Sequence, residues 1–126
     1  MKRLRHILQE SRGLIGPHEG KELGLMLRKT KPAAMISDDG LKKFQPHIKS
    51  GKFVYRAIPH PKSPKIMMHF VAQNEETLDR AVTAFKELMD HPNPTHNYAG
   101  HKKFGKALGY SEEAIAAYIK KQKGKE

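Results

Sequence analysis

The chain has 126 residues and a formal net charge of +11, from 24 Lys and Arg against 13 Asp and Glu. We expect one domain spanning residues 1–126, with a disordered basic tail over 120–126. The absence of cysteine excludes disulfide scaffolds, Cys-based zinc modules and thiol catalysis. No apolar run approaches the roughly 18 residues of a membrane span, and the basic start lacks the apolar stretch of a signal peptide. We therefore expect a cytoplasmic protein that does not contact membranes.

The positive charge is concentrated in the first half of the chain. Residues 1–63 hold 14 basic and five acidic side chains, whereas residues 64–126 hold 10 and eight. A field of this sign speeds encounter with polyanions and with acidic protein surfaces. The charge thus favours a binding function and leaves the identity of the partner open.

The first third of the chain predicts short elements. Apolar residues at helical spacing predict helices over 2–10 and 19–28. The short apolar run 33–36 predicts a buried strand, and the polar residues 37–40 predict the turn that closes it. Residues 41–48 are ambiguous, because the proline within them limits any helix.

The clearest sheet signal is a β-hairpin. Residues 52–58 and 66–73 are both rich in β-branched, aromatic and other apolar side chains. The loop 59–65 between them is too long for a two-residue turn but suits an antiparallel pair. A pairing symmetric about the centre of this loop places Tyr55 opposite His69.

The second half predicts three helices. Asn74 is a favourable N-cap for a helix over Glu75–Met89, whose apolar residues fall on one face. Two shorter helices follow over 98–108 and 112–121. This order predicts an α+β domain in which a small antiparallel sheet, the hairpin with a possible third strand near 33–37, is covered by helices on one face. The chain then ends in a helical hairpin.

This C-terminal hairpin combines small, apolar and capping residues at characteristic spacings: Gly105, Leu108, Gly109 at the turn, Ser111 as N-cap, Ile115 and Tyr118. With these residues it resembles the helix-turn-helix of DNA-binding regulators over about 20 residues. The resemblance implies that the second helix reads bases, but Glu112 and Glu113 stand where base edges would be met. Carboxylates there repel phosphate, and Ala116 and Ala117 offer no hydrogen bonds to bases. We therefore favour a hairpin that serves packing.

Basic and aromatic residues alternate around the predicted β-hairpin. Cations that neutralise phosphate beside rings that stack on bases are typical of surfaces that bind nucleic acid or nucleotides. Our leading hypothesis is a non-enzymatic binding protein for a polyanion, either nucleic acid or a phosphorylated nucleotide, with no cofactor. The candidate ligand-binding residues are Lys43, Lys52, Tyr55, Arg56, His60, Lys62 and His69.

Two other classes of function remain open. The chain could be a protein-interaction or inhibitor module, of the kind found among phage and mobile-element accessory proteins, that docks on an acidic host protein. It could instead be a phosphodiesterase that uses His60 and His69 as acid and base, or a metal hydrolase. For a metal, the candidate ligands are His91, His96 and His101, which are spaced five residues apart. The oligomeric state is left open.

Overall fold

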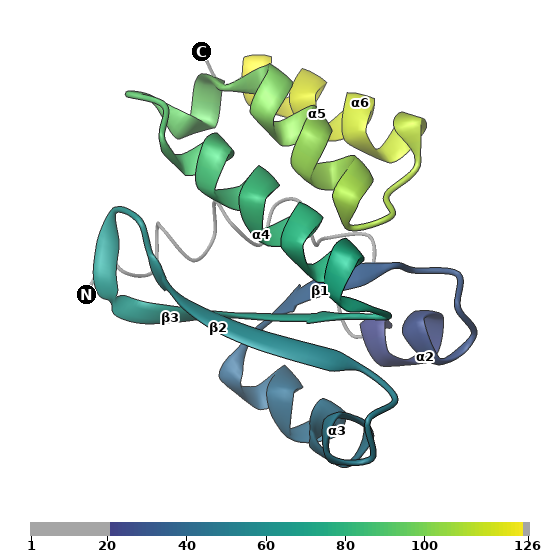
Figure 1. Ribbon diagram of the computed structural model, residues 1–126. Coiled ribbons are helices and arrows are strands. Elements are labelled where there is room, and N and C mark those ends of the chain that lie inside the picture. The colour runs from purple at the N-terminus through teal and green to yellow at the C-terminus, as the bar shows by residue number, and fades with distance from the viewer. Residues whose placement is uncertain (1–20, 125–126) are drawn as a thin grey trace.

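The computed structural model describes residues 21–124 and confirms the α+β class (Figure 1). The helix expected over 2–10 lies outside these residues. The helices are α2 (Glu22–Leu27), α3 (Asp38–Lys49), α4 (Glu75–Met89), the 3-10 turn η2 (Pro94–His96), α5 (Tyr98–Ala107) and α6 (Glu112–Lys123). The strands are β1 (Ala33–Ile36), β2 (Val54–His60) and β3 (Ser63–Ala72).

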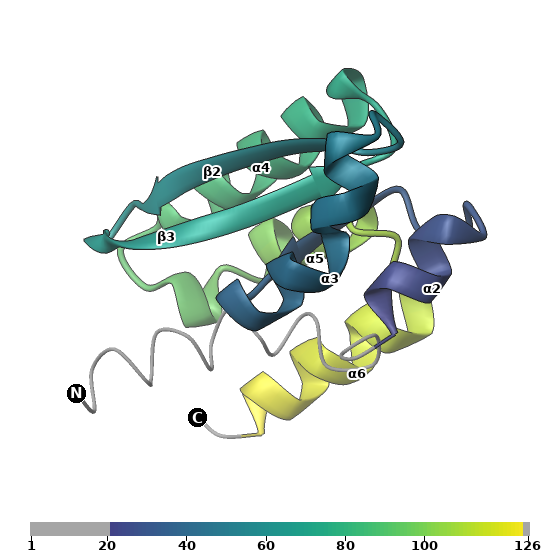
Figure 2. The ribbon, with the colours of Figure 1, turned by 90° about the horizontal axis from the view of Figure 1, so that it is seen from below.

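The sheet is antiparallel with the order β1-β3-β2, so β3 is central. Helix α4, backed by α5 and α6, covers one face, and α2 and α3 lie on the other (Figures 1 and 2). The sequence predicted helices on one face only. The difference arises because β1 buries all four of its residues, and a strand buried on both faces needs a helix on each side.

The larger core lies between the sheet and α4. The ring centroid of Phe85 on α4 is 5.5 Å from that of Phe70 on β3 and 5.4 Å from that of Phe104 on α5. All three side chains are fully buried. Tilted and edge-on aromatic contacts of this kind stabilise the core beyond the contribution of the apolar area that they bury. This cluster fixes α4 and α5 relative to the sheet.

A second, smaller core occupies the opposite face. Met26 of α2 and Phe44 of α3 pack there with Phe53 and with Val71 of β3, and all four are buried. The centroids of Phe44 and Phe53 are 5.9 Å apart. This cluster holds α2 and α3 against the sheet and positions the loop that leads into β2.

The hairpin is longer and tighter than its sequence predicts. Strand β2 continues to His60 and β3 begins at Ser63, so the loop contains two residues. Pro59 does not interrupt pairing, because β2 is an edge strand and the register shifts between Pro59 and His60. Pro64 lies at the start of β3, beyond the residues that pair with β1. The predicted register is wrong, because Tyr55 pairs with Val71 and not with His69.

Helix α3 begins within the turn expected over residues 37–40, and the ambiguous segment 41–48 is helical. Ser37 is its N-cap, and the Ser37 hydroxyl accepts a hydrogen bond from the N–H of Gly40 at 3.2 Å. Pro46 lies inside the helix and removes one backbone hydrogen bond. The helix continues because Phe44 is buried and Ile48 packs beside it against the sheet.

Helix α4 begins and ends where the sequence predicts. The side chain of Asn74 accepts a hydrogen bond from the N–H of Thr77 at 2.8 Å. The helical hairpin of α5 and α6 is also confirmed, with Ser111 as the N-cap of α6. Helix α6 runs on to Lys123, so residues 120–123 of the expected disordered tail are helical.

Candidate functional site

The predicted ligand-binding residues do not form one surface. Tyr55 and His69 face α3, whereas Arg56 and His60 face α4 on the other side of the sheet. Successive residues of a strand point to opposite faces, so Tyr55 and Arg56 must separate. The remaining candidates are Lys43 on α3, Lys52 before β2 and Lys62 in the hairpin turn, and all three are exposed.

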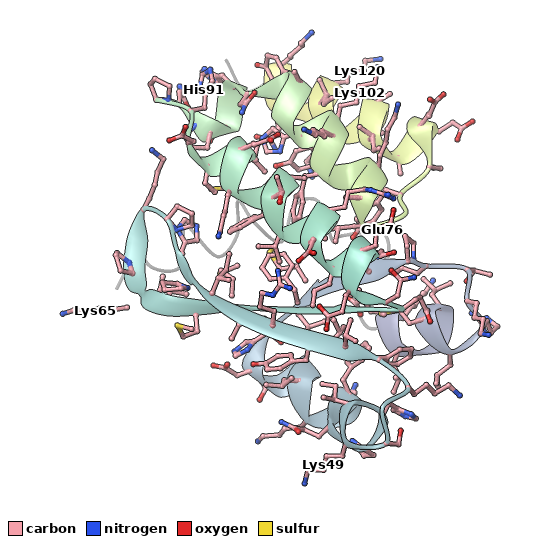
Figure 3. All side chains as sticks on the ribbon, in the orientation of Figure 1. Lys49, Lys65, Glu76, His91, Lys102 and Lys120 are labelled. Atoms are coloured by element: carbon pink, nitrogen blue, oxygen red, sulfur yellow. The ribbon has the colours of Figure 1, made fainter. Side chains whose placement is uncertain are left out.

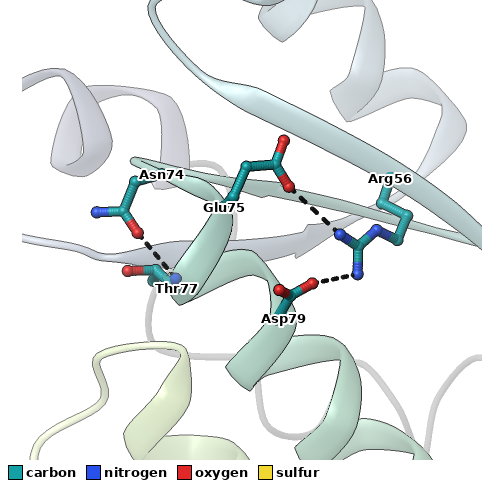
Figure 4. A network of polar contacts seen from close by, with 5 residues as sticks. All are labelled: Arg56, Asn74, Glu75, Thr77 and Asp79. Carbon is teal, nitrogen blue, oxygen red and sulfur yellow. Dashed lines mark hydrogen bonds and ion pairs between the residues drawn. The ribbon is translucent and has the colours of Figure 1, made fainter.

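Arg56 is held by two carboxylates of α4 (Figure 4). Its guanidinium lies 2.7 Å from Asp79 and 3.3 Å from Glu75. All three groups are partly or largely exposed, so the pairs contribute little to stability. They do neutralise the arginine, which makes Arg56 a poor partner for phosphate in this arrangement.

His60 and His69 do not face a common substrate. His60 is 2% exposed, its ring meets Phe85 of α4 edge-on, and its Nδ1 accepts the backbone N–H of Lys62 at 3.1 Å. His69 faces the opposite way, toward Asp38 of α3. The geometry therefore gives no support to acid–base catalysis by this pair.

His69 instead links Tyr55 to Asp38. Its Nε2 lies 2.6 Å from Asp38 and its Nδ1 lies 2.7 Å from the Tyr55 hydroxyl. A carboxylate only accepts, so Nε2 donates to Asp38, and Nδ1 forms the hydrogen bond with the Tyr55 hydroxyl. Partial burial, and then the charge of Asp38, raise the pKa of Tyr55. The phenol thus keeps its proton at neutral pH, and the contacts fix the orientation of a ring that is 36% exposed.

The three histidines of residues 91–101 have separate surroundings. His91 accepts the backbone N–H of Asn93 at 2.9 Å, and His96 contacts the Asn93 side chain at 2.9 Å. His101 is buried on α5, with its ring 5.1 Å from that of Tyr118 on α6. Among residues 21–124, no three His, Asp or Glu side chains are arranged to hold a metal ion.

The C-terminal hairpin is tightly packed at the positions that the resemblance singled out. A Cβ atom at Gly105 would lie 2.8 Å from Cγ1 of Ile115. Gly109 has φ 85°, and a Cβ there would lie 2.5 Å from Cδ of Pro32. These close approaches attach α6 to α5 and the turn to the segment before β1. Packing accounts for Gly105, and packing together with the positive φ accounts for Gly109.

The exposed lysines are distributed over several regions. Figure 3 shows Lys49 below α3, Lys65 at the hairpin tip, and Lys102 and Lys120 on the far side at α5 and α6. Helix α3 and the loop after it carry four exposed lysines, none of which pairs with a carboxylate among residues 21–124: Lys42, Lys43, Lys49 and Lys52. We call these four the α3 lysines.

One cavity adjoins the α3 lysines. It has a volume of about 480 Å³ and is lined by Met26, Leu27, Lys29, Lys52, Gln73 and Asn74. It lies where the end of α2, the loop before β2 and the loop between β3 and α4 meet. The sequence singled out Lys52 but not Lys29. Nothing near Lys29 marks it as a ligand contact, and only the fold brings it to the wall that Lys52 lines.

Comparison of the chain with protein-family models, with curated proteins and with solved structures finds no match. None of the helices within residues 21–124 is long and apolar enough to cross a membrane.

Proposed function

We propose that this protein is a non-enzymatic binding module for a polyanionic ligand, either nucleic acid or a phosphorylated nucleotide. The observation that carries the proposal is the set of α3 lysines, which are exposed and have no carboxylate partner within residues 21–124. Lysines without an acidic partner can neutralise the phosphates of a nucleic acid, and the release of the cations condensed on those phosphates drives binding.

The opposite face of the sheet is less suitable for this role. There the first turn of α4 is acidic, and Arg56 is neutralised by Glu75 and Asp79. Arg56 on this face of the sheet is therefore already paired, whereas the α3 lysines on the other face have no carboxylate partner in the described part of the chain. This contrast supports a ligand that approaches from the α3 side.

Tyr55 supplies an aromatic ring on the same side. Its ring is nearly parallel to that of His69, at an interplanar angle of 16°, and its hydroxyl is held by the hydrogen bond to Nδ1. A ring fixed in this way loses little conformational entropy on binding. Stacking of a base on such a ring is worth about 1–3 kcal/mol.

Fluorescence anisotropy with a labelled 12-nucleotide single strand tests the proposal at 50–300 mM salt. We expect log Kd to rise linearly with log salt concentration, because each lysine that meets a phosphate releases a counterion. The double variant Lys42→Gln/Lys49→Gln should bind more weakly and reduce the slope by about 0.7 for each lysine that contacts the strand.

The matched control is Lys102→Gln/Lys120→Gln, which removes the same charge from α5 and α6 and should alter binding less. Equal losses in the two double variants would show attraction by net charge alone and contradict a surface at α3. If neither the oligonucleotide nor a nucleotide binds at 50 mM salt, the proposed function is wrong.

A further inference from the structure

The cavity beside the α3 lysines has the size of a small-molecule site. Its volume of about 480 Å³ falls within the range of roughly 300–1,000 Å³ that such sites occupy. Its walls combine apolar side chains, amide side chains and two lysines. This is the mixture expected for a ligand with an apolar part and an anionic part.

The charge on the cavity wall is positive. Lys29 and Lys52 line it, and no carboxylate does so within the described residues. Both side chains are cationic, so an anion bound in this cavity would be attracted to two positive charges. The nearby acidic residues of the first turn of α4 are engaged elsewhere, since Glu75 lies 3.3 Å from Arg56 and Glu76 lies 3.2 Å from Arg80.

Lys29 has an unusual backbone conformation. Its φ is 61°, and it is the only non-glycine residue with positive φ among residues 21–124. It ends α2 in a Schellman motif, in which the N–H of Thr30 donates to Leu25 and the N–H of Lys29 donates to Met26, both at 3.0 Å. Glycine is the residue that this position favours. A lysine there has a conformational cost, and backbone outliers of this kind cluster at functional positions.

The other walls suit a nucleobase. Met26 and Leu27 provide an apolar surface, and methionine packs well against aromatic rings. The side-chain nitrogen of Gln73 donates to the carbonyls of Met26 at 2.7 Å and Lys31 at 3.2 Å. With both N–H groups of this amide committed, its carbonyl oxygen remains to accept a hydrogen bond from a donor such as the amino group of a base.

We infer that this cavity binds a nucleoside phosphate, with the phosphate between Lys29 and Lys52 and the base against Met26 and Leu27. The ligand is either a free nucleotide or the terminal nucleotide of a nucleic acid, which share this chemistry. The inference rests on the proposed binding of polyanions and adds to it a defined site and a stoichiometry of one.

Isothermal titration calorimetry of the full chain at 50 mM salt tests the inference. The probes are AMP, CMP, GMP, UMP, inorganic phosphate, and a 12-nucleotide strand with and without a 5′-phosphate. We expect at least one nucleotide to bind saturably at one site and at least tenfold more tightly than phosphate. Lys29→Gly and Lys52→Gln should each weaken this binding at least fivefold.

The variant Lys29→Gly is informative because glycine relieves the positive φ. Its Tm should equal or exceed that of the parent chain, so that a loss of affinity cannot be attributed to unfolding. Lys102→Gln, at an exposed position on α5 outside both the cavity and the α3 lysines, is the matched control and should leave nucleotide affinity unchanged.

The outcomes separate the two proposals. If the oligonucleotide binds with or without its 5′-phosphate and no nucleotide binds, the cavity is not the site, while the α3 surface stands. An equal loss of nucleotide affinity in Lys102→Gln and Lys29→Gly, or phosphate that binds as tightly as the nucleotides, would also overturn the inference. Stronger binding of the 5′-phosphorylated strand than of AMP, lost in Lys29→Gly, supports a terminal nucleotide. The reverse order supports a free one.

Discussion

Replacing Lys31 with methionine should change how the stability of the fold depends on pH. Lys31 is 1% exposed, its ammonium group donates to the carbonyl of Leu108, and it lies 4.5 Å from the centroid of the Tyr110 ring. Burial lowers the pKa of Lys31 from 10.5 to about 8, and the nearby charge of Glu22 opposes this shift. The charged lysine is therefore less stable in the folded protein than in the unfolded chain.

The size of the effect follows from the difference in pKa. A pKa lowered from 10.5 to about 8 corresponds to about 3 kcal/mol of destabilisation when the lysine is charged in both states. Between about pH 8 and pH 10.5 the unfolded state holds more protons than the folded state. The free energy of unfolding therefore rises with pH in this window. The destabilisation is fully present below pH 8 and about 2.5 kcal/mol of it is removed by pH 10.

Urea denaturation of the parent chain and of Lys31→Met at pH 7, 8, 9 and 10 measures this effect. The free energy of unfolding of the parent, relative to the variant, should rise by about 2.5 kcal/mol between pH 7 and pH 10. Other titrating groups contribute equally to both proteins and cancel. Lys42→Met, at an exposed position, is the control and should run parallel to the parent. If Lys31→Met also runs parallel, Lys31 titrates normally and the reasoning is refuted.

Two further predictions concern packing and the tyrosine. In the same urea denaturation assay, Gly105→Ala should destabilise the fold by about 1–3 kcal/mol, because its Cβ would lie 2.8 Å from Ile115. The matched change Gly24→Ala meets no atom within 4 Å and should stabilise α2 by about 0.5–1 kcal/mol. Equal effects of the two changes would contradict the packing argument. The raised pKa of Tyr55 should appear as one phenol that ionises above pH 10 in an absorbance titration. This phenol should be missing in Tyr55→Phe and ionise at lower pH in Asp38→Asn, and an unchanged titration in Asp38→Asn would exclude the charge of Asp38 as a cause.

The sequence predicts the elements whose signals are local. Helix α4 is found over the predicted Glu75–Met89, because its N-cap and its apolar spacing depend only on neighbouring residues. The strand at Ala33–Ile36 and the two helices of the C-terminal hairpin follow in the same way. Helix α3 was not predicted, because the packing of Phe44 against the sheet outweighs the unfavourable local effect of Pro46.

The composition of the site could be predicted only in part. The register of the hairpin shifts between Pro59 and His60, and the partner of Tyr55 lies two residues further along β3 than predicted. No local pattern marks this irregularity. Tyr55 and His69 nevertheless come together, since a shift of two residues keeps both on the same face. Arg56 was expected to contact the ligand, but α4 packs on the face of the sheet that carries Arg56 and pairs it with Glu75 and Asp79.

By itself, then, the sequence determined the net charge, the absence of thiol chemistry, and most of the helices and strands. The tertiary structure alone decided which basic side chains stay without an acidic partner and which of them meet. Lys29 and Lys52 line one cavity although 22 residues separate them in the chain, and Arg56 is neutralised by a helix that begins 19 residues later. Charge interactions depend on distance in space, and the fold sets those distances.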